Sequence, residues 1–176
     1  CFFFFAQPFA DGSLKEFTWA RAASDARRVA AYLRSLELEA GTRIALMSNN
    51  CAYWIIADLA IWLAGHFSVP IYPVLTGSSV RQILDHSSAQ VMFAGKLDKW
   101  TEIQTGVDFS IKIITFPSES SVPADAGKEW NHILSEFGPI IDNPLPSLDD
   151  LAMIVYTSGT TGVPKGVMQT HTSNII

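Results

Sequence analysis

The sequence predicts an α/β fold with a mostly parallel sheet and helices on both faces. Short apolar runs rich in β-branched residues alternate along the chain with longer segments whose apolar residues recur at helical spacing. Composition agrees, because 48% of the 176 residues are hydrophobic and 16% are charged, which is typical of a globular protein rather than a disordered one. No internal repeat is visible.

The chain opens with an edge strand and an amphipathic helix. A Phe-rich run at residues 2–5 leads to the turn "ADGS" at 10–13, as an edge strand before a turn would. Thr18 is a helix cap, and the apolar residues that follow it share one helical face. That face is formed by Ala22, Ala26, Val29, Leu33 and Leu36.

The middle of the chain supplies most of the alternation. Strands are expected at 43–48, 68–72, 90–95 and 111–116, and helices at 52–64 and 78–87. The helix at 52–64 is apolar on most sides, but it is too short to span a bilayer and carries Asp58, so a buried helix is the better interpretation.

The composition changes after Pro117. Residues 117–127 are loop-like, 128–137 predict a short helix, and 138–150 form a Pro-rich approach to a buried strand, "LAMIVY", at 151–156. Ligands of parallel α/β sheets bind beyond the carboxyl ends of strands. The residues that follow Tyr156 are therefore the candidate site.

Charge and cysteine content exclude some classes of protein. The formal net charge is -5 and the basic residues are scattered, which argues against nucleic acid as a partner. Two cysteines, Cys1 and Cys51, form no disulfide framework and are compatible with a reducing cytosol. The chain starts without Met and stops after two isoleucines, so we expect it to be incomplete at both ends.

The candidate site is the segment "YTSGTTGVPKG", Tyr156 to Gly166, in which eight of eleven residues are Thr, Ser, Gly or Pro. Its glycines allow unusual backbone conformations and close approach to a ligand, and successive free N–H groups form an anion-binding concavity. Lys165 adds a positive charge on a flexible stem. The predicted phosphate ligands are Thr157, Ser158, Gly159, Thr160, Thr161, Gly162 and Lys165.

This loop is not the common nucleotide-binding loop G-x-x-x-x-G-K-[ST]. Pro164 stands where the second glycine belongs, and Gly166 rather than Ser or Thr follows Lys165. The dinucleotide pattern G-x-G-x-x-G fails as well. A polar surface loop of chance composition stays as the plain alternative.

The order of residues, rather than the composition, resembles a known family. "YTSGTTGVPKGV" is similar at every position to the phosphate-loop signature of the adenylate-forming (AMP-binding) enzymes: acyl-CoA synthetases, adenylation domains of peptide synthetases and firefly-type luciferases. "IWLAGHFSVPIYP" at 61–73 resembles an upstream family segment, and the likeness runs over essentially the whole chain. Two stretches, 68–95 and 149–171, are most like the long-chain fatty acid–CoA ligases.

The resemblance implies a two-step reaction and a set of cofactors. A carboxylate attacks the α-phosphate of ATP to give an acyl-adenylate and pyrophosphate, and the thiol of CoA then displaces AMP. Lys165 and the loop N–H groups would hold the leaving pyrophosphate, and the hydroxyl of Thr160 would lie near Mg²⁺. The likeness makes residues 1–176 the N-terminal portion of the AMP-binding domain, with the remaining sites and the C-terminal domain downstream.

Other candidate residues have plainer interpretations. His171 is more typical of a helix start or packing than of catalysis, and His66, His86 and His132 lack partners at metal spacing. The remaining interpretations are a hydrogen-bonded or partly exposed acid for Asp58, turn residues for Asp149 and Asp150, and core packing for Trp54 and Trp62.

Two classes of function stay open. The first is part of an ATP-dependent ligase for a medium- or long-chain fatty acid, or for another carboxylate such as an amino acid, aryl acid or short-chain acid. The second is a non-catalytic nucleotide-binding module. On either interpretation we expect a cytoplasmic protein without a transmembrane segment, with peripheral membrane association left open, and we expect this piece alone to be inactive.

Overall fold

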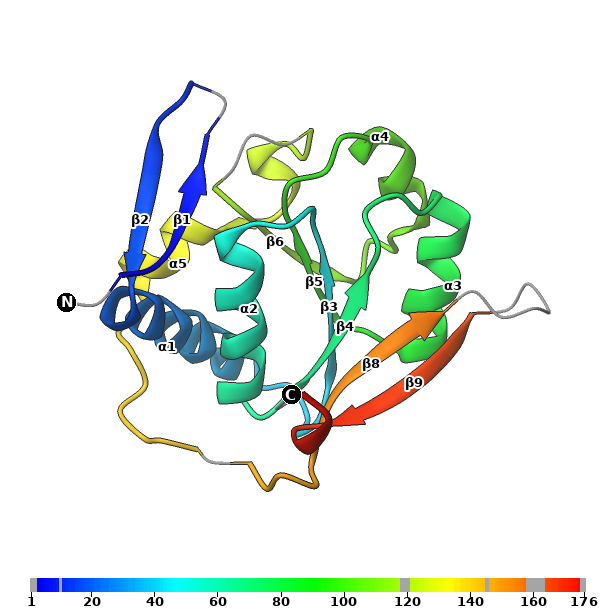
Figure 1. The fold of residues 1–176 in the computed structure, drawn as a ribbon. Coiled ribbons are helices and arrows are strands. Elements are labelled where there is room, and N and C mark those ends of the chain that lie inside the picture. The colour runs from blue at the N-terminus through cyan, green and yellow to red at the C-terminus, as the bar shows by residue number, and fades with distance from the viewer. Residues whose placement is uncertain (1–2, 10, 118–120, 145, 158–163, 175–176) are drawn as a thin grey trace.

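The computed structural model describes residues 3–9, 11–117, 121–144, 146–157 and 164–174. Its strands form a hairpin, β1-β2, and a seven-stranded sheet of order β7-β6-β5-β3-β4-β8-β9 (Figure 1). The strands are β1 (Phe3–Pro8), β2 (Leu14–Thr18), β3 (Arg43–Met47), β4 (Phe67–Ile71), β5 (Val91–Ala94), β6 (Lys112–Thr115), β7 (Lys128–Glu129), β8 (Leu151–Thr157) and β9 (Lys165–Thr170).

Neighbouring strands of the large sheet are parallel from β7 to β8, and the last pair, β8 and β9, is antiparallel. The helices are α1 (Trp19–Ser35), α2 (Ala52–Leu63), α3 (Gly77–Ser87), α4 (Trp100–Ile103) and α5 (Trp130–Glu136). Three short 3₁₀ turns complete the described elements: η1 (Gln104–Gly106), η2 (Ala124–Ala126) and η3 (Thr172–Asn174).

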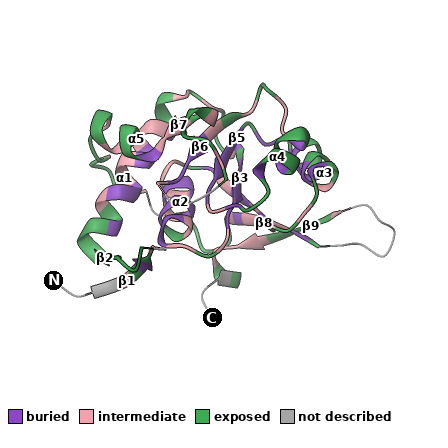
Figure 2. Cartoon of the chain, turned by 90° about the horizontal axis from the view of Figure 1, so that it is seen from above, coloured by how far each residue is buried: buried purple, intermediate pink, exposed green. Residues whose placement is uncertain are grey.

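Helices cover both faces of the sheet, as the sequence predicts. Alternate residues of β3 point to opposite faces, so Ile44 and Leu46 pack with α1, α2 and α5, whereas Ala45 and Met47 pack with α3 and α4. Figure 2 shows the buried residues gathered on the sheet and on the inner sides of these helices. The α/β class with a mostly parallel sheet is confirmed.

The helix cap expected at Thr18 is present, because its Oγ1 accepts a hydrogen bond from the Arg21 N–H at 3.2 Å. One expected helix start is wrong, and a strand next to the candidate site was not predicted. Lys128 and Glu129 open no helix; they extend to pair with β6, and α5 begins at Trp130. Residues 165–170 form a strand that the sequence does not predict.

The order in which successive strands join the sheet reverses at β3: β4 is added on one side of β3 and β5 on the other, and all three strands are parallel. From β3 it passes through α2 on one face to β4, and from β4 it crosses back through α3 on the other face to β5. The loops after β3 and β5 therefore leave neighbouring strands toward opposite faces. Such a point, where strand order reverses, is where open α/β sheets have a crevice.

Arginines of α1 hold the long connection between α5 and β8. Arg27 donates to the carbonyls of Ile140 and Asp142 at 2.9 and 2.7 Å, and Arg34 binds the Asp142 carboxylate at 3.0 Å. Figure 1 shows this segment passing beside α1 before it turns up into β8. These contacts lead the chain to the start of β8, the strand that carries the candidate site at its carboxyl end.

Candidate phosphate-binding site

The two ends of the predicted phosphate loop, Thr157 and Lys165, lie on the strands β8 and β9. β8 runs parallel to β4, with Ser68 opposite Met153, so its carboxyl end lies at the same edge of the sheet as the ends of β3, β4 and β5. β9 returns antiparallel, and Thr157 pairs with Lys165. The pairing brings the two ends of the loop together at the edge where parallel sheets bind ligands.

The loop is shorter than the sequence suggests. Thr157 closes β8 and Lys165 opens β9, so the expected exposed loop from Thr157 to Lys165 is wrong at both ends, although both residues are exposed. The other five predicted phosphate ligands lie outside the described residues: Ser158, Gly159, Thr160, Thr161 and Gly162. Thr160, the predicted Mg²⁺ contact, is among them.

Lys165 is available to a ligand. Its side chain is exposed, and among the described residues its ammonium has no ion pair or hydrogen bond. Lys165 is the first residue of β9 and pairs with Thr157 of β8. The strand pairing therefore fixes its backbone, while its side chain remains exposed. A free cation at the end of a hydroxyl-rich loop matches an anionic ligand.

Tyr156 anchors the hairpin to α3. The Tyr156 hydroxyl and His86 Nδ1 are 2.7 Å apart, and the two rings meet edge to face at 5.6 Å between centroids. Tyr156 is buried, and burial raises the pKa of its hydroxyl. The first residue of the motif thus holds the loop to the body of the sheet, and His86 is a packing residue with a defined partner.

Gly166, the last residue of the motif, leaves room for this anchor. A Cβ at Gly166 would lie 2.9 Å from Ile154 Cγ2 and 3.3 Å from Tyr156 Cζ. Its φ is outside the left-handed region, so the conformational freedom expected of this glycine is not what the position requires. The requirement is space beside the tyrosine ring.

β8 is less buried than the expected buried strand. Only Ala152 and Tyr156 are fully buried; the other apolar residues of the run are half-buried, because β9 beyond them is an exposed edge strand. Exposure reaches 73% at Met168. The apolar run "LAMIVY" therefore marks a strand near the sheet edge rather than at its centre.

The base of the hairpin is fixed by turns and an aromatic contact. Asp150 Oδ2 accepts a hydrogen bond from the Ser147 N–H at 2.8 Å, and its carbonyl accepts one from the His171 N–H. The His171 ring meets Trp62 edge to face at 5.1 Å. Asp150 takes part in a turn, as predicted, and His171 packs against Trp62.

Asp58 is more deeply buried than expected. It is 6% exposed, so the partly exposed alternative is wrong, and burial raises the pKa of its carboxyl to about 6, against a smaller opposing effect of the Ser68 hydroxyl. Its Oδ1 has no hydrogen-bond partner in the described part of the chain. Asp58 lies in α2 and belongs to the core rather than to the phosphate loop.

The described ranges contain no group of three His, Cys, Asp or Glu side chains that could hold a metal ion. None of the helices that the structure describes is both long and apolar enough to cross a bilayer.

The fold and the hairpin define a class of protein: an α/β protein with a mostly parallel sheet, in which the strand pair β8-β9 flanks a hydroxyl- and glycine-rich segment of the sequence. The family profile described as AMP-binding enzyme matches residues 5–176. A long-chain-fatty-acid–CoA ligase, FadD15, from Mycobacterium bovis is 35% identical over 179 aligned residues, which cover 97% of this chain. The chain therefore belongs to the AMP-binding enzyme family.

Two further comparisons show how broad the likeness is. An N-(5-amino-5-carboxypentanoyl)-L-cysteinyl-D-valine synthase from Penicillium rubens is 32% identical over 90% of this chain and 4% of its own length. The crystal structure of the anthranilate CoA ligase AuaEII with anthranoyl-AMP superposes with a TM-score of 0.77 at 20% identity, covering 94% of this chain and 32% of that one. The chain spans 29% of the length of the Mycobacterium bovis relative.

Proposed function

We propose that residues 1–176 are the N-terminal portion of the AMP-binding domain of an ATP-dependent acyl-CoA ligase. The observation that carries this proposal is the position of "YTSGTTGVPKG": its two ends pair as strands at the carboxyl edge of a parallel sheet, and Lys165 is exposed and unpaired among the described residues. Family membership supports the same assignment.

The proposed chemistry has two steps. A carboxylate oxygen of the acid attacks the α-phosphorus of ATP, and the bond from that phosphorus to the bridging oxygen breaks to release pyrophosphate. The sulfur of CoA then attacks the acyl carbon, and AMP leaves. Neither step needs a covalent bond to the protein, so alignment and charge stabilisation are what the protein supplies.

The hairpin loop would hold the phosphates. Lys165 neutralises charge on the leaving pyrophosphate, and the exposed Thr157 hydroxyl stands across the strand pair from it. The loop residues between them, Ser158, Gly159, Thr160, Thr161 and Gly162, complete the proposed cradle. Mg²⁺, approached by the Thr160 hydroxyl, would supply further positive charge to the phosphates.

A substitution at Lys165 tests this role. In the longer ligase, Lys165→Ala should slow carboxylate-dependent exchange of labelled pyrophosphate into ATP by about tenfold to a hundredfold, because one charged contact to the phosphates is lost. The thermal melting temperature should stay unchanged, since the side chain is exposed and unpaired among the described residues.

Lys112 provides the matched control. It is an exposed lysine at the first position of β6, on another strand of the same sheet, and Lys112→Ala should leave the exchange rate intact. Equal exchange rates in wild type and Lys165→Ala would show that Lys165 does not bind the phosphates. A loss of exchange accompanied by a large fall in melting temperature would also contradict the proposed role.

The acid that we propose as substrate is a medium- or long-chain fatty acid. The support is the likeness to a long-chain-fatty-acid–CoA ligase at 35% identity over nearly the whole chain. With ATP and CoA, the longer ligase should prefer decanoate and palmitate to acetate, benzoate and amino acids when release of AMP is measured. A preference for acetate or benzoate would contradict the fatty acid proposal.

A second candidate is an adenylation domain for a different carboxylate. The Penicillium relative favours it, because it is 32% identical and is named as a synthase of a cysteinyl-valine compound rather than as a CoA ligase. The same panel separates the two candidates. An amino acid that supports pyrophosphate exchange, with no thioester formed on CoA, would favour the second.

A further inference from the structure

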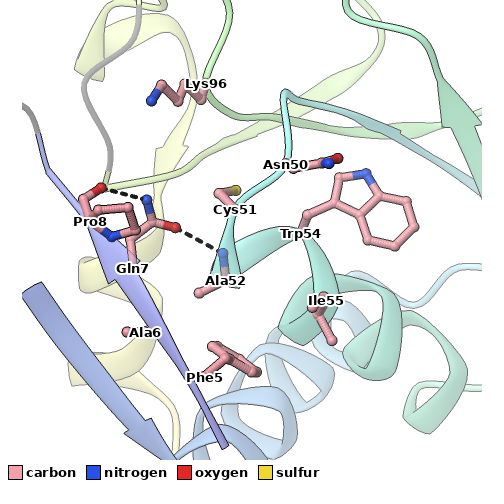
Figure 3. Close-up of a pocket in the computed structure, with 10 residues that line it drawn as sticks. All are labelled: Phe5, Ala6, Gln7, Pro8, Asn50, Cys51, Ala52, Trp54, Ile55 and Lys96. Atoms are coloured by element: carbon pink, nitrogen blue, oxygen red, sulfur yellow. Dashed lines mark hydrogen bonds between the residues drawn. The ribbon is translucent and has the colours of Figure 1, made fainter.

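A pocket of about 400 Å³ opens where β1 meets the start of α2, on the loops after β3 and β5 (Figure 3). This volume falls within the range of roughly 300–1,000 Å³ found for small-molecule sites. The pocket contains none of the described residues of the predicted phosphate loop, and in the sheet β4 lies between the strands of the pocket and β8. It is lined by Phe5, Ala6, Gln7, Pro8, Asn50, Cys51, Ala52, Trp54, Ile55 and Lys96.

The topology explains why a pocket forms here. The loop after β3 rises to α2 on one face of the sheet, and the loop after β5 leaves toward α4 on the other. Their divergence leaves a crevice beyond the carboxyl ends of two adjacent parallel strands. Ligands of doubly wound sheets bind in such crevices.

Hydrogen bonds between the two loops make the wall of the pocket rigid. Ser48 Oγ accepts from the Lys96 N–H at 2.8 Å, and the Lys96 carbonyl accepts from the Asn49 N–H at 2.9 Å. A Cβ at Gly95 would lie 2.4 Å from Ser48 Oγ, so only glycine allows this close approach. The backbone of Lys96 is therefore held at the mouth of the crevice.

Gln7 closes the opposite wall. Its Oε1 accepts a hydrogen bond from the Ala52 N–H at 2.9 Å, and its Nε2 donates to the Pro8 carbonyl at 2.8 Å (Figure 3). The amide of Gln7 is thus satisfied on both sides, and it occupies the first N–H of α2. A ligand anion cannot use that N–H and must find its charge partner elsewhere.

Lys96 is the cation on the pocket wall. Its side chain is half-buried on the pocket wall, and within the described ranges its ammonium has no ion pair or hydrogen bond. Among the described lining residues there is no second cation, so a singly charged group fits better than a di- or triphosphate. Figure 3 shows Lys96 on the far side of the pocket from the apolar side chains of Phe5 and Ile55.

We propose that this pocket binds a small carboxylic acid with an apolar body: the carboxylate pairs with Lys96, and the body lies on Phe5, Trp54 and Ile55. Ile55 is 42% exposed although it is a large apolar residue, so it offers surface to such a body. The proposal does not depend on the phosphate loop, because it assigns a second site at a different position on the sheet edge.

Calorimetric titration of the 176-residue chain with octanoate tests the proposal. Wild type should bind octanoate saturably, and Lys96→Gln should weaken binding by about tenfold, as expected for loss of one charge-assisted contact. Octanol, which has the same chain length without the charge, should bind weakly and equally to both proteins. Lys99→Gln is the matched control, because Lys99 is an exposed lysine near Lys96 that does not line the pocket.

Two more variants locate the binding. Ile55→Ser should weaken octanoate and octanol alike, because it removes apolar surface and leaves the charge. Lys165→Gln should leave octanoate binding intact, and a loss there would place the acid at the phosphate loop and overturn the proposal. Absence of saturable binding, or equal binding by wild type and Lys96→Gln with both proteins folded by circular dichroism, would also overturn it.

Discussion

At the residue scale, the buried carboxyl of Asp58 lowers stability at neutral pH. Burial raises its pKa from the ordinary 3.8 to about 6, so the folded state holds a proton in a pH range where the unfolded chain has lost it. The contribution of Asp58 to the free energy of unfolding is therefore greatest below pH 3.8, falls as the pH rises to about 6, and stays low above that.

Asp58→Asn should remove the penalty. We expect the variant to be more stable than wild type by about 1–3 kcal/mol at pH 7.5, and the difference should shrink toward zero near pH 4. Urea unfolding at both pH values measures it. Asp149→Asn, on an exposed turn residue, should show no such difference, and a constant offset between wild type and Asp58→Asn at both pH values would contradict the shifted pKa.

At the scale of elements, the β8-β9 hairpin depends on the fit between Tyr156 and Gly166. The tyrosine hydroxyl contacts His86 on α3, and a Cβ at Gly166 would lie only 3.3 Å from Cζ of the same ring. The motif therefore has a structural role and a proposed functional role. Its ends secure a hairpin to the sheet, and the residues between them carry the proposed phosphate chemistry.

Gly166→Ala should loosen the hairpin. The new methyl group must displace Ile154 or the Tyr156 ring, and overpacking of this kind costs about 1–3 kcal/mol. The free energy of unfolding in urea measures the loss. Gly138→Ala is the control, because nothing lies within 4 Å of a Cβ there; if both variants lose the same stability, the close contact is not the cause.

At the scale of the whole molecule, the elements that local sequence patterns define were predicted well. The elements that depend on contacts between distant residues were not. The cap at Thr18 and the period of the residues after it were enough to predict α1, and the apolar runs were enough for the central strands. β9 could not be read in "KGVMQT", because it exists through pairing with β8 and carries no apolar alternation of its own.

The same contrast between local sequence pattern and long-range contact holds for the candidate site. The order of residues in the loop predicted a phosphate cradle, whereas the contacts that support it join residues far apart in the chain. Tyr156 meets His86, which lies 70 positions away in the chain, and His171 meets Trp62. Each of these side chains is common in surface or packing roles, so nothing in its local sequence distinguishes it. Such contacts can be identified only from the three-dimensional structure, in which the topology brings the elements together.

The 176-residue chain itself should turn over nothing measurable. It spans 29% of the length of the Mycobacterium bovis relative, and the phosphate contacts proposed for it lie on a hairpin at the sheet edge, where exposed charges in water contribute little. Adenylation also requires the acid and the α-phosphate to be aligned, and alignment supplies a large part of such rate enhancements. We therefore expect weak ATP binding and no acyl-CoA when the purified chain is incubated with Mg²⁺, ATP, CoA and decanoate. Saturable turnover that disappears in Lys165→Ala and persists in Lys112→Ala would show that these residues hold a complete active site.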